Sequence, residues 1–282
     1  MRNNEDRLGS KAVQANSTAA TQAATGPAPL EFVRPTTIVT LPSEGKFYSE
    51  NHPLYNQDTI EIRQMTTAEE DILTSKTLLQ KGVALDKFLE RILIDSRVGP
   101  DDLLIGDKNA VMIQARIDGY GSDYTTQVSC PACEARQKFT FNLEESLSAT
   151  ATTTTDEITQ NEQGNFLVTL DNDWVVEFRA LTGADEKKIA KSMANKKKAG
   201  LPESPIQDQL NAIIVSVSGH SDRGTISKAV QHMTGKQSRT VREAYAKSIP
   251  NVELRSEFSC GSCGTATEME VPLTADFFWA RT

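Results

Sequence analysis

The chain has 282 residues, of which 38% are hydrophobic and 24% are charged, and its formal net charge is −8. This length allows one large domain or two small ones, and no apolar run reaches the about 18 residues that a transmembrane helix needs. The acidic balance argues against a protein that binds duplex DNA, whose affinity depends on basic side chains.

Residues 1–34 predict a disordered N-terminal arm. The stretch NSTAATQAATGPAP is rich in Ala, Thr and Pro and has no apolar periodicity. The first residues, MRNNEDRLGSKAVQ, lack the apolar core of a signal peptide. We therefore expect the protein to be made and kept in a reducing cytoplasm. Disulfides are rare there, and Cys-x-x-Cys pairs bind metal or perform redox chemistry.

Residues 35–143 are expected to form an N-terminal lobe. The segments TTIVT and DTIEIRQM predict two strands, separated by a turn at PSEG. Thr66 and Thr67 are followed three residues later by Glu69 and Glu70. Both spacings fit a capping box, so a helix should follow through Leu73. Apolar residues at helical spacing then predict helices over 84–96 and 107–118.

The end of this lobe carries the first cysteine pair. Gly119 and Gly121 are expected to end the preceding helix. Cys130 and Cys133 then lie between two strand-like segments, which predicts a strand, a knuckle and a second strand. The following residues 144–164 are Thr-rich and of low complexity, so they predict a flexible linker.

Residues 165–282 are expected to form a C-terminal lobe. NFLVTLDNDWVVEFRAL predicts a β-hairpin with a turn at its Asp-Asn-Asp sequence. Thr182, with an aspartate three residues later, predicts the start of a basic helix through Lys198. Further helices are predicted over 206–217 and 238–248.

The chain ends with a second knuckle and an aromatic cluster. VELRSEFSCGSCGTATEMEVPL repeats the strand, knuckle, strand pattern around Cys260 and Cys263. Phe277, Phe278 and Trp279 follow in an acidic setting, so we expect a packed C-terminal anchor and not a platform for stacking bases.

The four cysteines predict one structural zinc site. Two residues between the cysteines of each pair let both sulfurs face one ion, and two pairs complete the tetrahedron of thiolates that zinc accepts. A redox dithiol and unconnected free thiols are the alternatives, but each pair sits between strands instead of at the start of a helix. Catalytic zinc is not expected, because four protein ligands leave no open position. The metal ligands predicted are Cys130, Cys133, Cys260 and Cys263.

Other chemistry is not predicted. His52, His220 and His232 have no partner at metal-binding spacing and are expected at the surface. Phosphate-binding loops and nucleophile elbows are missing from the sequence, so no catalytic or cofactor-binding residue is assigned. Residues 183–247 contain twelve Lys and Arg against six Asp and Glu. This basic stretch is either a solvated helix face or a docking surface for an acidic partner.

An ordered series of motifs resembles a known family. Gly106-Asp107, Arg116 and Tyr120-Gly121 precede a Cys-Pro-x-Cys knuckle, with LPSEGKFY and MTTAEEDIL upstream and FSCGSCG and DFFW downstream. Over roughly Pro35 to Trp279, the series is similar to the baseplate hub or hub-assembly proteins of large contractile-tailed bacteriophages of the T-even type.

The resemblance implies a non-enzymatic structural or assembly component of the virion tail baseplate, made in the host cytoplasm, whose partners are other tail proteins. It does not indicate an oligomeric state. The alternative is a zinc-ribbon protein that binds nucleic acid or a transcription complex, and a thiol oxidoreductase is a third hypothesis. The second knuckle is flanked by Glu257, Glu268 and Glu270, against Arg136 and Lys138 at the first, so nucleic acid is not favoured. The expected fold is α+β: mixed helices and short antiparallel hairpins, in two lobes joined by a four-Cys, zinc-ribbon-like site.

Overall fold

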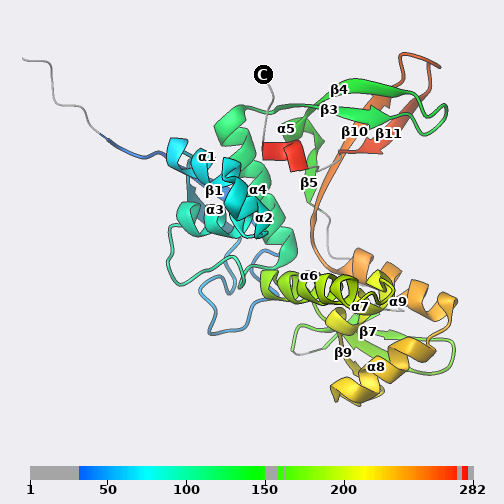
Figure 1. Ribbon diagram of the computed structural model, residues 1–282. Helices are drawn as coiled ribbons and strands as arrows, with labels where there is room; N and C mark the ends of the chain where they lie inside the picture. Colours follow the sequence, from blue (N-terminus) through cyan, green and yellow to red (C-terminus); the bar gives the residue numbers. More distant parts are fainter. Residues whose placement is uncertain (1–31, 150–157, 162, 272–274, 279–282) are drawn as a thin grey trace, which may run out of the picture. The chain divides into compact units, whose positions relative to one another are not determined.

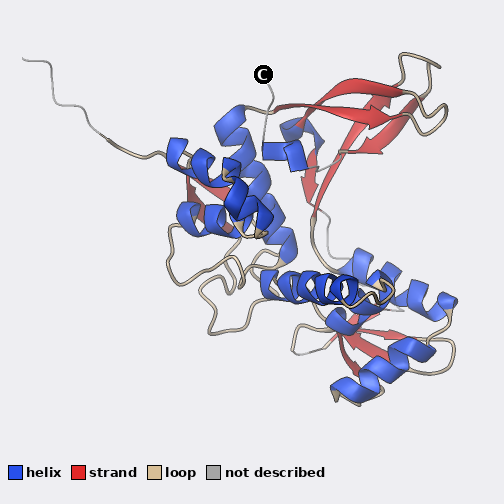
Figure 2. Cartoon of the chain, in the orientation of Figure 1, coloured by secondary structure: helices blue, strands red, loops and turns tan. Residues whose placement is uncertain are grey.

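The computed structural model describes residues 32–149, 158–161, 163–271 and 275–278. Helices are mixed with short antiparallel sheets along these stretches (Figure 1, Figure 2), which confirms the predicted α+β class. Most of the predicted N-terminal arm, the middle of the predicted linker and Trp279 lie outside the described residues. Within the described ranges, no helix combines the length and the hydrophobicity needed to span a bilayer.

The first part of the chain packs a two-stranded sheet against helices. Its elements are β1 (Thr36–Thr40), β2 (Thr59–Arg63), α1 (Thr67–Thr74), α2 (Lys76–Gln80), α3 (Ala84–Ile92) and α4 (Ile105–Tyr120). Val39 pairs with Ile60 across the sheet, and both side chains are buried. The alternation of the two strands therefore turns one apolar face toward α3 and α4, as the sequence predicts.

Of the two capping boxes that the sequence allows, the one between Thr66 and Glu69 forms at the start of α1. The backbone N–H of Thr66 donates to Glu69 Oε2 over 3.1 Å. The Glu69 side chain is fully buried and also binds Arg34 at 2.8 Å and Arg91 at 3.2 Å. Burial alone would raise the pKa of Glu69, but the bonds from Thr66 and the two guanidinium groups lower it below its ordinary value.

Two helix ends differ from the predictions. α3 ends four residues earlier than predicted, because Leu93 leaves the helix and forms an antiparallel bridge with Ile62. α4 continues through Gly119 and ends at Gly121, where φ is 81°. A Cβ at Gly119 would lie 2.1 Å from Met65 Cε, the flexible end of that side chain, so Met65 would have to move to admit a larger residue there.

A second hydrophobic cluster forms between residues 158 and 249. Its elements are β6 (Ile158–Gln160), β7 (Phe166–Thr169), β8 (Val175–Phe178), α6 (Gly183–Lys198), α7 (Pro205–Ile213), β9 (Ile214–Val217), α8 (Arg223–His232) and α9 (Gly235–Ser248). The strands pair in the order β6-β7-β8-β9, and α7, α8 and α9 contact this sheet. The predicted hairpin is β7–β8, and Asp173 adopts a φ of 61° in its turn.

The prediction of a helix over 206–217 is wrong for the last third of this range. α7 stops at Ile213, and the next four residues form β9, which pairs antiparallel with β8. The run Ile-Val-Ser-Val is rich in β-branched residues, and pairing with an existing strand outweighs the helical spacing. α8 was not predicted, although its N-cap Asp222, which accepts from Thr225 N over 2.8 Å, is a start signal in the sequence.

The two cysteine hairpins lie side by side and belong to the first hydrophobic cluster (Figure 1). The elements are β3 (Asp123–Ser129), β4 (Arg136–Asn142), α5 (Leu143–Ser146), β5 (Leu147–Ala149), β10 (Val252–Ser259), β11 (Ala266–Glu270) and a 3₁₀ turn (Ala275–Phe278). The rings of Phe139 and Phe258 are 5.3 Å apart, so the second hairpin packs on the first, although it follows the second cluster in sequence. The predicted anchor holds for Phe277 and Phe278, which are both buried.

Regular structure extends into the segment predicted as a flexible linker. Within 144–164, α5 ends at Ser146, β5 pairs with β10, and β6 pairs with β7. Ile158 is buried in the second cluster, which explains why this end of the segment is ordered. The predicted boundaries at residues 144 and 164 stay a prediction.

Candidate metal centre

The two cysteine knuckles have the same backbone geometry. In each, the N–H of the first cysteine donates to the carbonyl five residues later, over 3.0 Å from Cys130 to Ala135 and 2.9 Å from Cys260 to Thr265. These bonds close the turn between the two strands of each hairpin. A Cys-x-x-Cys sequence in such a turn brings both of its sulfurs to the same side.

Backbone N–H groups also point at the first sulfur of each pair. Ala132 N lies 3.4 Å from Cys130 Sγ, and Ser262 N lies 3.4 Å from Cys260 Sγ. Such contacts stabilise a thiolate, because the peptide dipole opposes its negative charge. The equivalence of the two contacts follows from the equal spacing in the two motifs.

The four sulfurs form one cluster. Cys130 Sγ lies 3.7 Å from Cys263 Sγ, Cys133 Sγ lies 3.7 Å from Cys260 Sγ, and all four lie within 4.8 Å of one another. A zinc tetrathiolate with bonds of about 2.3 Å has edges of about 3.8 Å. The arrangement therefore fits a tetrahedral metal ion, and the structure brings together all four cysteines that the sequence predicts.

The cluster is half covered by protein. Cys130 and Cys260 are buried, whereas Cys133 and Cys263 are exposed. Phe258 is fully buried and belongs to the same hydrophobic cluster as Cys130 and Cys260. One edge of the site is thus open to water, so an ion could enter without unfolding of the hairpins.

Gln137 joins the hairpins next to the cysteines. Its Nε2 donates to Ser259 O over 3.1 Å, and its Oε1 accepts from Gly261 N over 3.0 Å. Gln137 was not among the residues predicted for this site. The available signal was its position on β4, two residues before Phe139 and therefore on the same face of the strand.

The pKa values of the thiols depend on the groups and sulfurs packed around them. The hydroxyl and the backbone of Thr265 lower the pKa of Cys263 to about 6. The backbone N–H of Ala135 also lowers the pKa of Cys133, but hydrogen bonds to the neighbouring sulfurs raise it by more, to about 12. The thiolate form is thus favoured at Cys263 and disfavoured at Cys133, as expected when adjacent negative charges repel. A bound cation would remove this conflict and stabilise all four thiolates.

Other polar residues of the ordered motifs support the fold. Arg116 is 1% exposed, and its Nε donates to Phe277 O over 2.8 Å. Its Nη1 donates to Gly121 O over 2.9 Å, and its guanidinium lies 5.0 Å from the centre of the Tyr120 ring. Arg116 therefore ties the end of α4 to the C-terminal turn.

Asp107 is the centre of a fully buried network. Its carboxylate accepts from Ser43 N over 3.0 Å, from Ser43 Oγ over 2.6 Å and from the Tyr48 hydroxyl over 2.8 Å. The Tyr48 oxygen in turn accepts from Leu104 N over 3.1 Å. Burial raises the pKa of Asp107 and of Tyr48. Because the network is internally satisfied and closed to water, it supports packing and not proton transfer.

None of the three histidines belongs to the cysteine cluster. His220 and His232 are exposed, as predicted. His52 differs from the prediction: it is partly buried, stacks on Tyr48 with ring centres 4.3 Å apart, and accepts from Leu54 N over 3.1 Å. Burial lowers the pKa of His52, which favours its neutral form.

A comparison with known families agrees with the ordered motifs. The family model described as T4 bacteriophage base plate protein matches residues 34–279. This range covers most of the chain and includes both cysteine hairpins. No curated protein and no solved structure matches the chain.

Proposed function

The chain belongs to the family of T4 bacteriophage base plate proteins, and from this membership we propose that it is a non-enzymatic structural or assembly component of the contractile tail, folded around one zinc ion. The family places it in the tail baseplate of the virion, with other phage tail proteins as its partners. The predicted narrower role, as a hub or hub-assembly protein, is part of this proposal.

The convergence of the four sulfurs is the observation that supports a structural metal. Cys133 and Cys260 are 127 positions apart in the sequence, yet their sulfurs lie 3.7 Å apart. Such a site cannot form locally, so its binding energy would stabilise the tertiary contact between the hairpins. Thiolate ligands in a tetrahedron favour zinc over the hard cations magnesium and calcium.

The geometry also supports a role without catalysis. Four cysteine ligands would fill the coordination sphere and leave no position for water or substrate. The buried polar network at Asp107 is satisfied by its own hydrogen bonds. We therefore assign the metal a structural role and the protein's surfaces a docking role.

The charges on the hairpins do not favour nucleic acid as the partner. Glu257 lies directly opposite Glu268 in the register of β10 and β11, so the second hairpin presents paired carboxylates. Phosphates would be repelled by this pair. The basic side chains Arg136 and Lys138 lie on β4 of the first hairpin, and Arg255 of the second hairpin already pairs with Glu253 and Glu268.

Two measurements test the proposal. Metal analysis of protein purified under reducing, chelator-free conditions should give about one zinc ion per chain, and protein without metal would refute the zinc assignment. In a phage carrying an amber mutation in the gene, electron microscopy should show tails with absent or incomplete baseplates. Normal baseplates and full infectivity without suppression would refute the structural role.

A further inference from the structure

A groove of about 400 Å³ lies between α6, α7 and the start of α8. Three basic residues line it: Arg179 before α6, Lys188 on α6 and Arg223 at the beginning of α8. The partly buried side chains of Ile189 and Ala212 also line it. The groove thus combines positive charge with an apolar surface.

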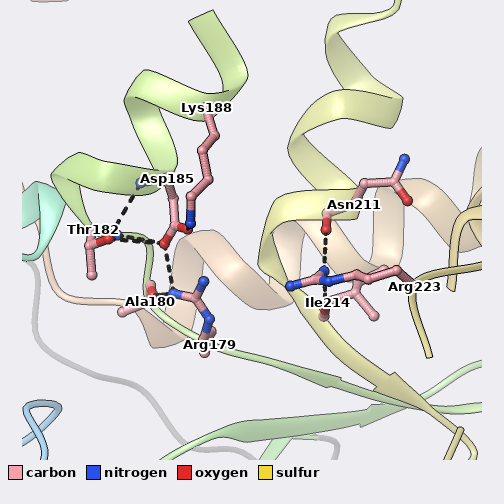
Figure 3. A network of polar contacts seen from close by, with 8 residues as sticks. All are labelled: Arg179, Ala180, Thr182, Asp185, Lys188, Asn211, Ile214 and Arg223. Atoms are coloured by element: carbon pink, nitrogen blue, oxygen red, sulfur yellow. Dashed lines mark hydrogen bonds and ion pairs between the residues drawn. The ribbon is translucent and has the colours of Figure 1, made fainter. Parts of the chain in front are cut away.

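The carboxylates in the groove are already neutralised. Asp185 accepts from Arg179 Nη1 over 2.8 Å and from Thr182 N over 3.1 Å, and its side chain is 8% exposed (Figure 3). Asp208 accepts from Lys196 Nζ through both oxygens, over 2.6 and 2.8 Å. Neither carboxylate is therefore available to balance further cations.

Two cations remain without such balance. Lys188 has a side chain that is 77% exposed and lies 3.5 Å from Asp185, which Arg179 already pairs. Arg223 reaches beneath the end of α7, where Nη1 donates to Asn211 O over 2.9 Å (Figure 3). Among the described residues, Arg223 contacts backbone carbonyls but no carboxylate, because its neighbour Asp222 caps α8.

We propose that this groove is a docking site for an acidic peptide segment of another tail protein. A carboxylate of the segment would lie between Lys188 and Arg223, and an adjacent aliphatic side chain would cover Ile189 and Ala212. Arginine and lysine at a partly apolar site bind carboxylates with charge-assisted hydrogen bonds, which favours one partner over others. The inference rests on the proposed function and adds the chemistry of one partner.

Nucleic acid fits the groove less well. The positive charge that remains in the groove comes from Lys188 and Arg223, which suits a single carboxylate better than the many charges of a polyphosphate backbone. The chain as a whole carries a net charge of −8, which repels a long polyanion more than a short acidic segment.

Fluorescence anisotropy tests the proposal with the full chain. The probe is a labelled peptide, Glu-Asp-Leu-Asp-Glu, and its uncharged counterpart is Gln-Asn-Leu-Asn-Gln. We expect the acidic peptide to bind, and the affinity to fall about tenfold or more in Lys188→Gln and in Arg223→Gln, since each removes one charge-assisted contact. Lys228→Gln is the matched control, because Lys228 is an exposed lysine on α8 that does not line the groove, and it should leave the affinity unchanged.

Several outcomes would overturn the proposal. The uncharged peptide could bind as tightly as the acidic one, or both groove variants could bind the acidic peptide as tightly as the wild type. An oligonucleotide could also bind more tightly than the acidic peptide and lose affinity in the same variants. Arg223 also caps α7, so a melting curve must show that Arg223→Gln folds. If Arg223→Gln does not fold, Lys188→Gln, which changes an exposed side chain, still decides the test. Peptide binding without any baseplate defect in the amber phage would refute the proposed function alone, and a baseplate defect without peptide binding would refute this inference alone.

Discussion

Glu134 and Gly264 occupy the same position in the two knuckles and share a left-handed backbone, with φ of 58° and 73°. Each N–H donates to the carbonyl of the first cysteine of its motif, over 2.9 Å in both cases. Glycine adopts this conformation without strain, whereas a side chain with a Cβ does not. The first knuckle therefore stores a small strain that the second avoids.

Exchanging the residue types at these positions should change stability in opposite directions. Glu134→Gly should raise the free energy of unfolding by up to about 1 kcal/mol, and Gly264→Ala should lower it by about 1 kcal/mol. No heavy atom lies within 4 Å of a Cβ at Gly264, so the loss would be conformational and not steric. Thermal melting of the metal-loaded protein measures both changes, and shifts of the same sign would contradict the prediction.

Removing one sulfur should remove the metal. Cys260→Ser should reduce the bound zinc from about one ion per chain to a small fraction and lower the melting temperature, because the metal's binding energy also stabilises the fold. Ser262→Ala in the same knuckle is the matched control, since its contact to Cys260 Sγ comes from the backbone N–H. Metal analysis with thermal melting checks both variants, and an unchanged melting temperature in Cys260→Ser would mean that the hairpins hold together without the ion.

Gln137→Ala should loosen the contact between the hairpins. Both of its bonds, to Ser259 O and Gly261 N, would be lost, and the free energy of unfolding should fall by about 1–2 kcal/mol. Gln127→Ala, an exposed glutamine on β3, should have almost no effect. Urea unfolding measures the difference, and equal midpoints for the two variants would show that the bridge does not contribute.

Arg116→Met should be strongly destabilising despite similar volume. The substitution leaves the carbonyls of Phe277 and Gly121 without their donor, and we expect a loss of about 3 kcal/mol. Hydrogen exchange should increase most at residues 275–278, which the arginine holds against α4. Arg136→Met, at an exposed arginine on β4, is the control and should keep both the stability and the exchange pattern.

Asp185 makes the stability dependent on pH at the acid end. Burial raises its pKa, but the bonds from Arg179 and Thr182 lower it by more, to about 2. Because the folded pKa lies below the unfolded one, the stabilisation is present above about pH 4 and is lost as the pH falls through 2. Asp185→Asn should therefore be less stable than the wild type by about 2 kcal/mol at pH 7, and the difference should shrink toward pH 2.

The urea midpoints of the two proteins between pH 7 and pH 2.5 check this prediction. Loss of the metal at low pH affects both proteins and cancels in the comparison. Gln127→Ala changes no ionisable group, so it is the control and should show a difference that does not vary with pH. A constant difference for Asp185→Asn would show that its ionisation does not contribute.

Local signals in the sequence were sufficient for many elements. The capping box at Thr66, the hairpin β7–β8 and the two knuckles depend on residues close together in the chain, so spacing alone predicts them. The apolar pattern of the helix predicted over 206–217 includes Leu210 and Val217, and both are buried, but Val217 lies in a strand. A periodic apolar pattern indicates which side chains are buried, and the partner strand decides the backbone they adopt.

The sequence by itself determined that four cysteines in two equal motifs could hold one ion, because the spacing within each pair is a local property. Only the tertiary structure decided that the second hairpin packs in the first hydrophobic cluster, although the residues of the second cluster come before it in the chain. The tertiary structure alone also showed that Gln137 bridges the two hairpins. It likewise showed that Lys188 and Arg223, which no carboxylate fully neutralises, line one groove. These features depend on contacts between residues far apart in the chain, and no spacing within one segment encodes such contacts.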